Sequence, residues 1–382
     1  MRSRNPKSTI YQWSIYVIST LLIFLSSVLL LVSAVVINLF RLVEKLVRLS
    51  KKKTLTAISL LFFLFLILAL AYTFLSPLGW EKDEKSFFLL VEKGDSLHKI
   101  SQKLEGSGLK FNPQLFSLSA KLLNVDRKIF PGRYDFQKGL TLWDLISKFY
   151  RKEISTIDVT IPEGSNLSQI AGILKKEIEL DSTLFVKACF NTGLIHDLGL
   201  NSRNLEGYLF PDTYKLFWKM EPEKIIRIMV RELENVITDS LKSQLKKINL
   251  NLYEVLILAS LIESEAKIDQ ERPLISSVYH NRLKIGMPLQ CDPTVIYALG
   301  GLDRPLTLKD LEVDSPYNTY RYPGLPPGPI NNPGKASILA AFSPAEVKYL
   351  YFVAKGDGSH IFSLDLEEHN RAKAKIKKEN KS

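Results

Sequence analysis

Cysteine and histidine are scarce in this chain, and their scarcity excludes several kinds of chemistry. The 382 residues include 2 cysteines and 5 histidines. Cys189 and Cys291 show no Cys-x-x-Cys or Cys–His spacing, which argues against a disulfide scaffold and a structural zinc site. One bridge in an exported domain is an alternative, but two buried free thiols are the favoured interpretation.

The histidines fit neither a metal-binding signature nor a Ser-His-Asp elbow, and the sequence has no glycine-rich phosphate loop. They are His98, His196, His280, His360 and His369. We therefore expect no metal and no cofactor. If the protein is an enzyme, its chemistry must come from carboxylates and hydroxyls.

Two long stretches near the N-terminus carry no charge. They cover residues 8–40 and 54–80, and each exceeds the roughly 20 residues that a membrane-spanning helix needs. They predict transmembrane helices at residues 14–40 and 55–76, although the first stretch also suits an interfacial helix. Between them, residues 41–53 hold six basic residues against Glu44. By the positive-inside rule this loop is cytoplasmic, so the large C-terminal part faces outward. A cleaved signal peptide is not expected, because the apolar run is too long.

The positive charge of the chain is concentrated in this membrane region. Residues 1–80 carry nine Lys or Arg and one Glu, a balance of +8 out of +11 for the whole chain. Subtracting these from 51 basic and 40 acidic residues leaves 42 and 39, a balance of only +3. The basic character is thus a sign of membrane topology, and no nucleic-acid partner is expected.

A short pattern occurs three times in the middle of the chain. Each copy has an extended apolar stretch, a glycine, an N-cap residue and then apolar residues at helical spacing. The glycines and N-caps are Gly94 with Ser96, Gly139 with Thr141, and Gly164 with Asn166. Each copy predicts a strand, a glycine turn and a short amphipathic helix that packs on a neighbour.

The first copy, residues 91–101, resembles the opening of a LysM module, a small glycan-binding domain. A purely structural strand–helix repeat is the alternative. We expect residues 86–152 to form a LysM-like α/β subdomain. The third copy, with Ile161-Pro162-Glu163-Gly164, then opens the next domain.

A nearly uninterrupted apolar segment leads into Glu263. Residues 255–262 are apolar except for Ser260, and Asn251 with Glu254 resembles a capping box, so the pattern predicts a buried helix. Burial without a cationic partner raises the pKa of a carboxyl group, as a general acid near neutral pH requires. The alternative is that Glu263 marks where a core helix emerges into solvent. Glu265 points to a different face and is no obvious partner.

Several later segments combine aromatic, amide and hydroxyl side chains with glycine and proline. Rigid loops of this kind suit sugars, whose faces stack on rings while their hydroxyls form directed hydrogen bonds. The alternative is that these residues serve the fold alone. The segments are residues 205–214, 278–283, 289–297, 315–320 and 324–330.

Together and in this order, these motifs and Leu258-Ala259-Ser260-Leu261-Ile262-Glu263-Ser264-Glu265 resemble the endolytic murein transglycosylases (the MltG or YceG-like family). Tyr349-Leu350-Tyr351-Phe352-Val353-Ala354 fits the same family, and the resemblance covers residues 87–370. It implies an anchored bacterial plasma-membrane protein whose outward-facing domain cleaves peptidoglycan glycan strands internally. The family's catalytic glutamate falls on Glu263. This chain departs from the pattern in having two predicted spans instead of one and Cys291 where members often have Thr.

The implied reaction breaks the MurNAc–GlcNAc bond and leaves a 1,6-anhydro-MurNAc end. Such a lyase needs one acid/base, whereas hydrolysing glycosidases generally need two carboxylates. We expect Glu263 to be this acid/base, protonated at rest. For holding the sugars we predict Gln290, Asp292, Asn318, Tyr320, Glu206 and Tyr208. Asp292 or Glu206 would otherwise be the second carboxylate of a hydrolase.

Two other functions stay open at this point: a lysozyme-type hydrolase and a non-catalytic peptidoglycan-binding membrane protein. The expected fold class is α+β, with a membrane region at 1–80, the LysM-like subdomain at 86–152 and a mixed catalytic domain at 154–375. A late hairpin is predicted, with strands at 349–353 and 361–363. Expected partners are peptidoglycan glycan strands and the synthases that make them.

Overall fold

The computed structural model describes the chain except for residues 1–37, 39–40, 42–43, 46–50, 82–84 and 380–382. Nearly all of the first predicted span, at residues 14–40, lies outside the described residues. The helices are α2 (Lys51–Leu75), α3 (Leu97–Gly106), α4 (Pro113–Leu122), α5 (Leu142–Tyr150), α6 (Leu167–Ile178), α7 (Ser182–Cys189), α8 (Thr192–Asp197), α9 (Pro222–Val236), α10 (Asp239–Lys242), α11 (Leu245–Ile248), α12 (Leu252–Glu265), α13 (Arg272–Lys284), α14 (Asp292–Ala298), α15 (Lys335–Phe342) and α16 (Leu366–Glu379), with 3-10 turns η1 (Asp269–Glu271) and η2 (Asp310–Glu312). The strands are β1 (Gly79–Trp80), β2 (Ser86–Val91), β3 (Leu109–Lys110), β4 (Gly132–Gln137), β5 (Thr156–Thr160), β6 (Thr213–Phe217), β7 (Tyr351–Ala354) and β8 (His360–Ser363).

The strands pair only in twos over the described residues, and every pair is antiparallel. The pairs are β1 with β3, β2 with β4, β5 with β6, and β7 with β8. Helices and short sheets therefore share the structure, which confirms the predicted α+β class. The predicted late hairpin is confirmed as well, with its first strand beginning two residues later than expected, at Tyr351.

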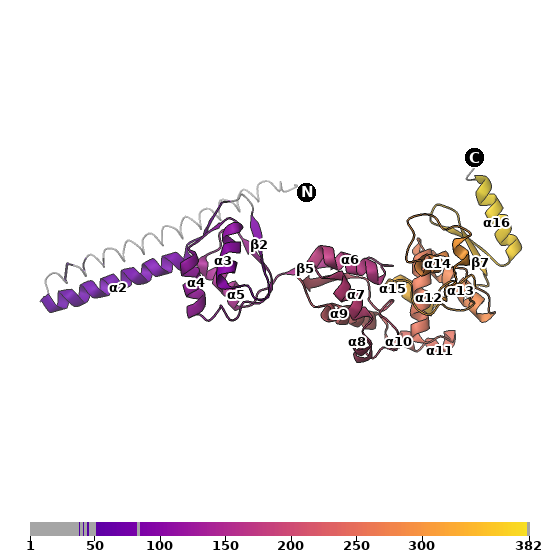
Figure 1. Ribbon diagram of the computed structural model, residues 1–382, viewed down its shortest axis with the longest axis horizontal. Coiled ribbons are helices and arrows are strands. Elements are labelled where there is room, and N and C mark those ends of the chain that lie inside the picture. The colour runs from indigo at the N-terminus through magenta and orange to yellow at the C-terminus, as the bar shows by residue number, and fades with distance from the viewer. Residues whose placement is uncertain (1–37, 39–40, 42–43, 46–50, 82–84, 380–382) are drawn as a thin grey trace, which may run out of the picture.

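Helix α2 extends away from the rest of the described chain (Figure 1). Its segment Ile58–Leu75 is long and apolar enough to cross a membrane and is not buried inside the protein. The helix contacts α5, and its Phe74 packs against buried residues of the protein. An apolar helix that is otherwise so exposed is typical of a membrane span. The helix predicted at residues 55–76 is thus present.

All three copies of the repeated unit fold as the sequence predicts. The glycines Gly94, Gly139 and Gly164 each have a positive φ, which lets the chain turn from strand into helix. The N-cap side chains of Ser96, Thr141 and Asn166 then accept a backbone N–H three residues on. In these segments, local turn and cap chemistry determines the structure.

Two hydrophobic clusters divide the described chain near Ile154. The first joins buried residues from Phe87 to Phe149, in which β2 and β4 pair and α3, α4 and α5 cover them. The second runs from Val159 to Phe342 and includes both predicted thiols, Cys189 and Cys291. Both cysteines are free and buried, as expected. The LysM-like character of the first unit stays a prediction.

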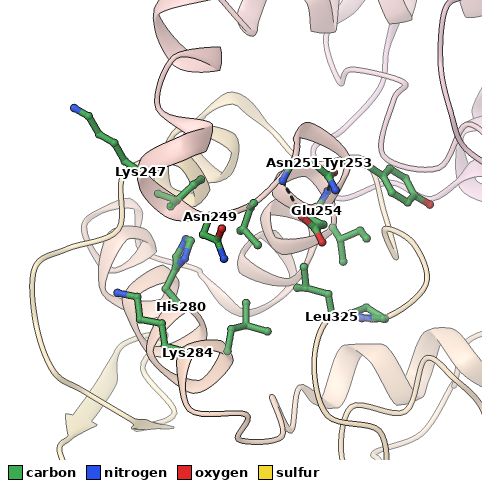
Figure 2. Close-up of a pocket in the computed structure, with 13 residues that line it drawn as sticks. Lys247, Asn249, Asn251, Tyr253, Glu254, His280, Lys284 and Leu325 are labelled. Carbon is green, nitrogen blue, oxygen red and sulfur yellow. Dashed lines mark hydrogen bonds between the residues drawn. The ribbon is translucent and has the colours of Figure 1, made fainter.

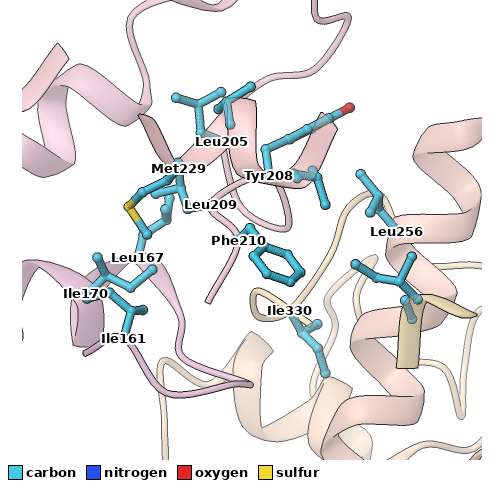
Figure 3. Packing of buried hydrophobic residues seen from close by; sticks show 14 of the residues in the cluster. Ile161, Leu167, Ile170, Leu205, Tyr208, Leu209, Phe210, Met229, Leu256 and Ile330 are labelled. Atoms are coloured by element: carbon cyan, nitrogen blue, oxygen red, sulfur yellow. The ribbon is translucent and has the colours of Figure 1, made fainter. Parts of the chain in front are cut away.

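The loop before β6 joins the two halves of the second cluster. Figure 3 shows Phe210 between Ile161 and Ile170 on one side and Leu256 of α12 on the other, with Ile330 nearby. Gly207 has a φ of +83°, and a Cβ there would lie 2.4 Å from Pro329 Cγ. The loop and the proline-rich segment can therefore pack this closely only around a glycine.

We expect Gly207→Ala to destabilise the fold by about 3 kcal/mol or more, because it adds a steric clash to left-handed backbone strain. Gly199→Ala is the matched control, since Gly199 has a φ of +70° but open space around it. That control should cost only about 1 kcal/mol. Urea unfolding of the protein in detergent measures both. Equal losses in the two variants would contradict the close packing against Pro329.

Candidate active site

Helix α12 delivers Glu263 to the surface of the second cluster. The predicted capping box is present: the Glu254 amide donates to Asn251 Oδ1 at 3.0 Å, and the Asn251 amide donates to Glu254 Oε2 at 2.7 Å. Every residue from 255 to 262 is buried. Ser260, the polar residue in this segment, accepts the Ile330 amide at 3.1 Å and so holds the next loop. Glu263 follows with its side chain only 8% exposed.

Two groups bind the Glu263 carboxylate. The Gly334 amide, at the N-cap of α15, donates to Oε2 at 3.0 Å. On the other oxygen, Arg272 Nη1 lies 3.3 Å from Oε1. The expectation of a carboxyl without a cationic partner is therefore wrong. Proximity of a guanidinium from α13 could not be seen from the sequence around α12 alone.

Arg272 is itself buried, at 7% exposure, and it connects three elements. Besides Glu263, its Nε donates to Asp269 of η1 at 3.0 Å, and its Nη1 donates to the Ser337 hydroxyl of α15. A buried guanidinium with several acceptors is fixed in orientation. Sequence reasoning missed this residue, since nothing in the local pattern marks it.

A second carboxylate, Glu163, reaches the N-terminus of α15 from the turn of the third repeat. A Cβ built on the next residue, Gly164, would lie 3.5 Å from Glu263 Cγ, so this turn passes directly beside the catalytic candidate. The Lys335 amide of α15 donates to Glu163. Burial, and after it the charge of Glu263, raises the pKa of Glu163. From the sequence, Glu163 was expected only to form part of a turn.

Asn332 fastens that turn to the rest of the site. It is fully buried, and its backbone amide and Nδ2 both donate to the Ser165 carbonyl, at 3.0 and 2.9 Å. The backbone carbonyl of Asn332 accepts the Gly164 amide at 2.9 Å. Its Nδ2 also donates to Glu206 Oε1 at 2.9 Å, and its Oδ1 accepts the Leu209 amide at 2.9 Å. One side chain therefore joins three segments that are far apart in the sequence.

Glu206, predicted to hold sugars or to be the second carboxylate of a hydrolase, lies in the core at 3% exposure. Its carboxylate accepts the Leu167 amide at the start of α6 and, at 3.4 Å, the Tyr297 hydroxyl. Burial raises its pKa from 4.5 to about 7, against the hydrogen bonds that lower it. Such a group suits a structural junction better than a sugar contact.

Two further predicted sugar contacts are also used inside the protein. Asn318 is fully buried, its Nδ2 donates to the carbonyls of Leu311 and Val313, and its Oδ1 accepts the Tyr320 amide. Tyr208 is buried and its ring stacks on Tyr253 with a centroid separation of 6.0 Å. Both residues stabilise loops, so neither is carried forward as a sugar contact.

Gln290, Asp292 and Tyr320 remain available to a ligand. Gln290 and Asp292 are exposed, and the Tyr320 hydroxyl donates to Asp292 Oδ1. Burial raises the pKa of Glu265, and the nearby charge of Asp292 adds to this. These residues therefore lie on the Glu265 side of α12. Glu265 accepts a hydrogen bond from the Tyr279 hydroxyl at 3.4 Å, whereas Glu263 contacts Arg272 and the Gly334 amide, so the two carboxylates have different partners.

A pocket of about 570 Å³ lies at the other end of α12 (Figure 2). Asn251, Glu254, His280, Lys284 and Leu325 are among the residues that line it. Because Asn251 caps the start of α12 and Glu263 lies in its last turn, this pocket is separate from the Glu263 site.

Comparison with known proteins gives consistent results. A model of the YceG-like family matches residues 89–375. A Bacillus subtilis (strain 168) protein named "Endolytic murein transglycosylase" is 37% identical over 315 residues, covering 77% of this chain and 86% of the relative. A Streptococcus pneumoniae (strain D39) protein of the same name is 32% identical over 315 residues, covering 74% of this chain and 56% of the relative, so the chain spans about half of that protein. The crystal structure of a YceG-like protein from Listeria monocytogenes has a TM-score of 0.54 and 34% identity, covering 75% of this chain and 98% of that one.

We expect stability to fall between pH 4.5 and about 7 because of Glu206, whose pKa is raised over this range. The folded state keeps the Glu206 proton while the unfolded state releases it, so the contribution is full below the unfolded pKa and is lost as pH rises through the folded pKa. The loss is about 3 kcal/mol. Urea unfolding at pH 4.5, 6 and 8 measures it, with Glu206→Gln as the control that lacks the titration. Parallel pH profiles of the two proteins would contradict this assignment.

Proposed function

The chain belongs to the YceG-like family, and on that premise we propose that it is an endolytic murein transglycosylase with Glu263 as its acid/base. The reaction is cleavage of the MurNAc–GlcNAc bond within peptidoglycan glycan strands. The assignment of Glu263 as the acid/base is supported by its position. The buried segment of α12, residues 255–262, ends there, and the side chain meets an α15 amide, a buried arginine and the turn of the third repeat.

The proposed chemistry needs one carboxyl group that acts twice. Glu263 gives its proton to the GlcNAc oxygen as the bond from that oxygen to C1 of MurNAc breaks. The 6-hydroxyl of the same MurNAc then attacks C1 and returns its proton to Glu263. The products are a free GlcNAc hydroxyl and a 1,6-anhydro-MurNAc end, and no water is consumed. Proton transfer by a positioned side chain typically contributes about 10²–10⁴-fold to the rate.

Arg272 and the Gly334 amide have a clear part in this scheme. Both bind the charged form of Glu263, which is the form that follows proton donation. A preorganised cation and an amide at a helix N-terminus stabilise such a developing charge without rearranging. They also hold the carboxylate in one orientation until it receives the 6-hydroxyl proton.

A hydrolase is the second candidate function, because Glu163 supplies another carboxylate near Glu263. Hydrolysing glycosidases place their two carboxylates on opposite sides of the bond, with room for the sugar ring between them. Here Glu263 and Glu163 accept the amides of consecutive residues, Gly334 and Lys335. Side-by-side carboxylates fit an acid/base with a neighbour better than a pair across a glycosidic bond.

We also propose where the protein lies in the cell and which of its surfaces bind the strand. Residues 1–80 anchor the protein in the bacterial plasma membrane, with residues 41–53 in the cytoplasm and the catalytic part, 154–375, outside. A site so tethered meets glycan strands as they emerge from their synthases and terminates their elongation. We further propose that the LysM-like subdomain, 86–152, contacts the strand, and that Gln290, Asp292 and Tyr320 bind sugars. The exposed polar groups beside α14 support this last assignment.

Glu263→Gln should abolish the formation of 1,6-anhydro-MurNAc ends, with a loss of at least about 10²-fold in rate, because the amide cannot donate or accept the proton. Mass spectrometry of glycan strands incubated with the full chain in detergent measures the products. Glu254→Gln, on the same helix, is the matched control, because glutamine also serves at this capping position. It should keep full activity. Retained cleavage in Glu263→Gln would disprove the acid/base assignment, and reducing ends from the parent would indicate a hydrolase.

A further inference from the structure

The N-terminus of α15 holds two carboxylates from distant parts of the chain. Glu263, from α12, accepts the Gly334 amide at 3.0 Å. Glu163, from the turn between β5 and α6, accepts the amide of the next residue, Lys335. The two carboxylates therefore accept hydrogen bonds from neighbouring backbone amides at the N-terminus of α15, where the helix dipole also favours negative charge. Glu263 is nearly buried, whereas Glu163 is only partly covered and keeps much of its side chain exposed to solvent.

Gly334 shows how closely Glu163 approaches. A Cβ on this residue would lie 1.9 Å from Glu163 Oε1 and 2.0 Å from its Cδ. The backbone at Gly334, with φ −75° and ψ 170°, suits any residue, so backbone strain does not explain the glycine. The space for the Glu163 carboxylate explains it. The same glycine then donates its amide to Glu263.

The charges around this pair do not balance when both carboxylates are ionised. The groups that face Glu163 are Glu263 from α12, Arg272 from α13, Asp269 from η1 and the amide of Lys335 from α15. One guanidinium thus faces three carboxylates. Like charges sharing one site favour the binding of a proton, and the titration then belongs to the pair and not to either member. Burial and the charge of Glu263 raise the pKa of Glu163 accordingly.

We propose that Glu163 is a positioning residue that acts through Glu263: its like charge at the same helix N-terminus keeps one proton bound within the pair, so that a proton is available for Glu263 to donate. The inference rests on the proposed function of Glu263. It gives the site a source for the proton, since Arg272 and the Gly334 amide both bind the charged form of Glu263. When the proton leaves for the GlcNAc oxygen, both carboxylates are ionised, and the proton of the 6-hydroxyl returns to the pair through Glu263.

The first test is the pH dependence of kcat/KM in Glu163→Gln, measured on the full chain in detergent with glycan strands. Glutamine keeps the size of the side chain and an oxygen that accepts the Lys335 amide, but it removes the charge. We expect the alkaline limb of the profile to move down by about one pH unit, and activity above that limb to fall about tenfold. Glu163→Asp, which keeps the charge, should retain a profile closer to that of the parent. A Glu163→Gln profile with its alkaline limb unmoved would overturn the inference.

The second test moves Glu163 without changing any charge. Gly334→Ala keeps the amide that binds Glu263, and the atoms nearest to its methyl group belong to the flexible end of Glu163. We expect a thermal midpoint within about 2 °C of the parent and the same shift of the alkaline limb as in Glu163→Gln. The double variant should behave like Glu163→Gln alone, because both changes remove one interaction. An unmoved limb in Gly334→Ala, or additive shifts in the double variant, would overturn the inference.

Glu263→Gln separates this inference from the proposed function. If Glu263→Gln is inactive at every pH while Glu163→Gln keeps the parent profile, the role of Glu163 is wrong and the function of Glu263 stands. If Glu263→Gln remains active, the proposed function fails first, whatever Glu163→Gln does.

Discussion

The buried amide of Asn332 is the interaction on which the candidate site depends. Its side chain binds the Ser165 carbonyl, the Glu206 carboxylate and the Leu209 amide, and its backbone binds the same turn from the other side. A buried polar group of this kind must have its partners, because an unmade bond in the interior costs about 1–3 kcal/mol. The segments it contacts are therefore fixed relative to one another, and none of them can shift alone.

The same hydrogen bonds fix the positions of Glu163 and of the amide that binds Glu263. Asn332 holds the turn that contains Glu163, and it stands two residues before Gly334, whose amide binds Glu263. From the other side, Ser260 of α12 holds Ile330, so the segment between Ile330 and Gly334 is fastened at both ends. The N-terminus of α15 is thereby placed against Glu263, and Arg272 closes the arrangement by binding both Glu263 and Ser337. A catalytic carboxylate gains from such fixed donors because they need no reorganisation during the reaction.

Features that depend on neighbouring residues could be predicted from the sequence. The three strand–turn–helix units and the start of α12 were predictable because glycine turns and N-caps act over three or four residues. The relation of Glu263 to a buried helix followed from its apolar run. In contrast, Arg272, Glu163 and Asn332 act through contacts with residues far away in the sequence, which a local pattern does not encode. For the same reason, Glu206, Asn318 and Tyr208 were assigned to sugars, although all three are buried. The local sequence around a polar or aromatic loop residue does not distinguish one that faces a ligand from one that faces the core.

The most direct test of the account is a crystal structure of the Glu263→Gln protein with a peptidoglycan glycan strand bound. The account predicts that the oxygen of a MurNAc–GlcNAc bond lies within hydrogen-bond distance of the residue 263 side chain, at the N-terminus of α15. The 6-hydroxyl of that MurNAc should lie on the side from which it can attack C1. A strand bound elsewhere, with no glycosidic oxygen near residue 263, would contradict the central claim that this helix end is the active site.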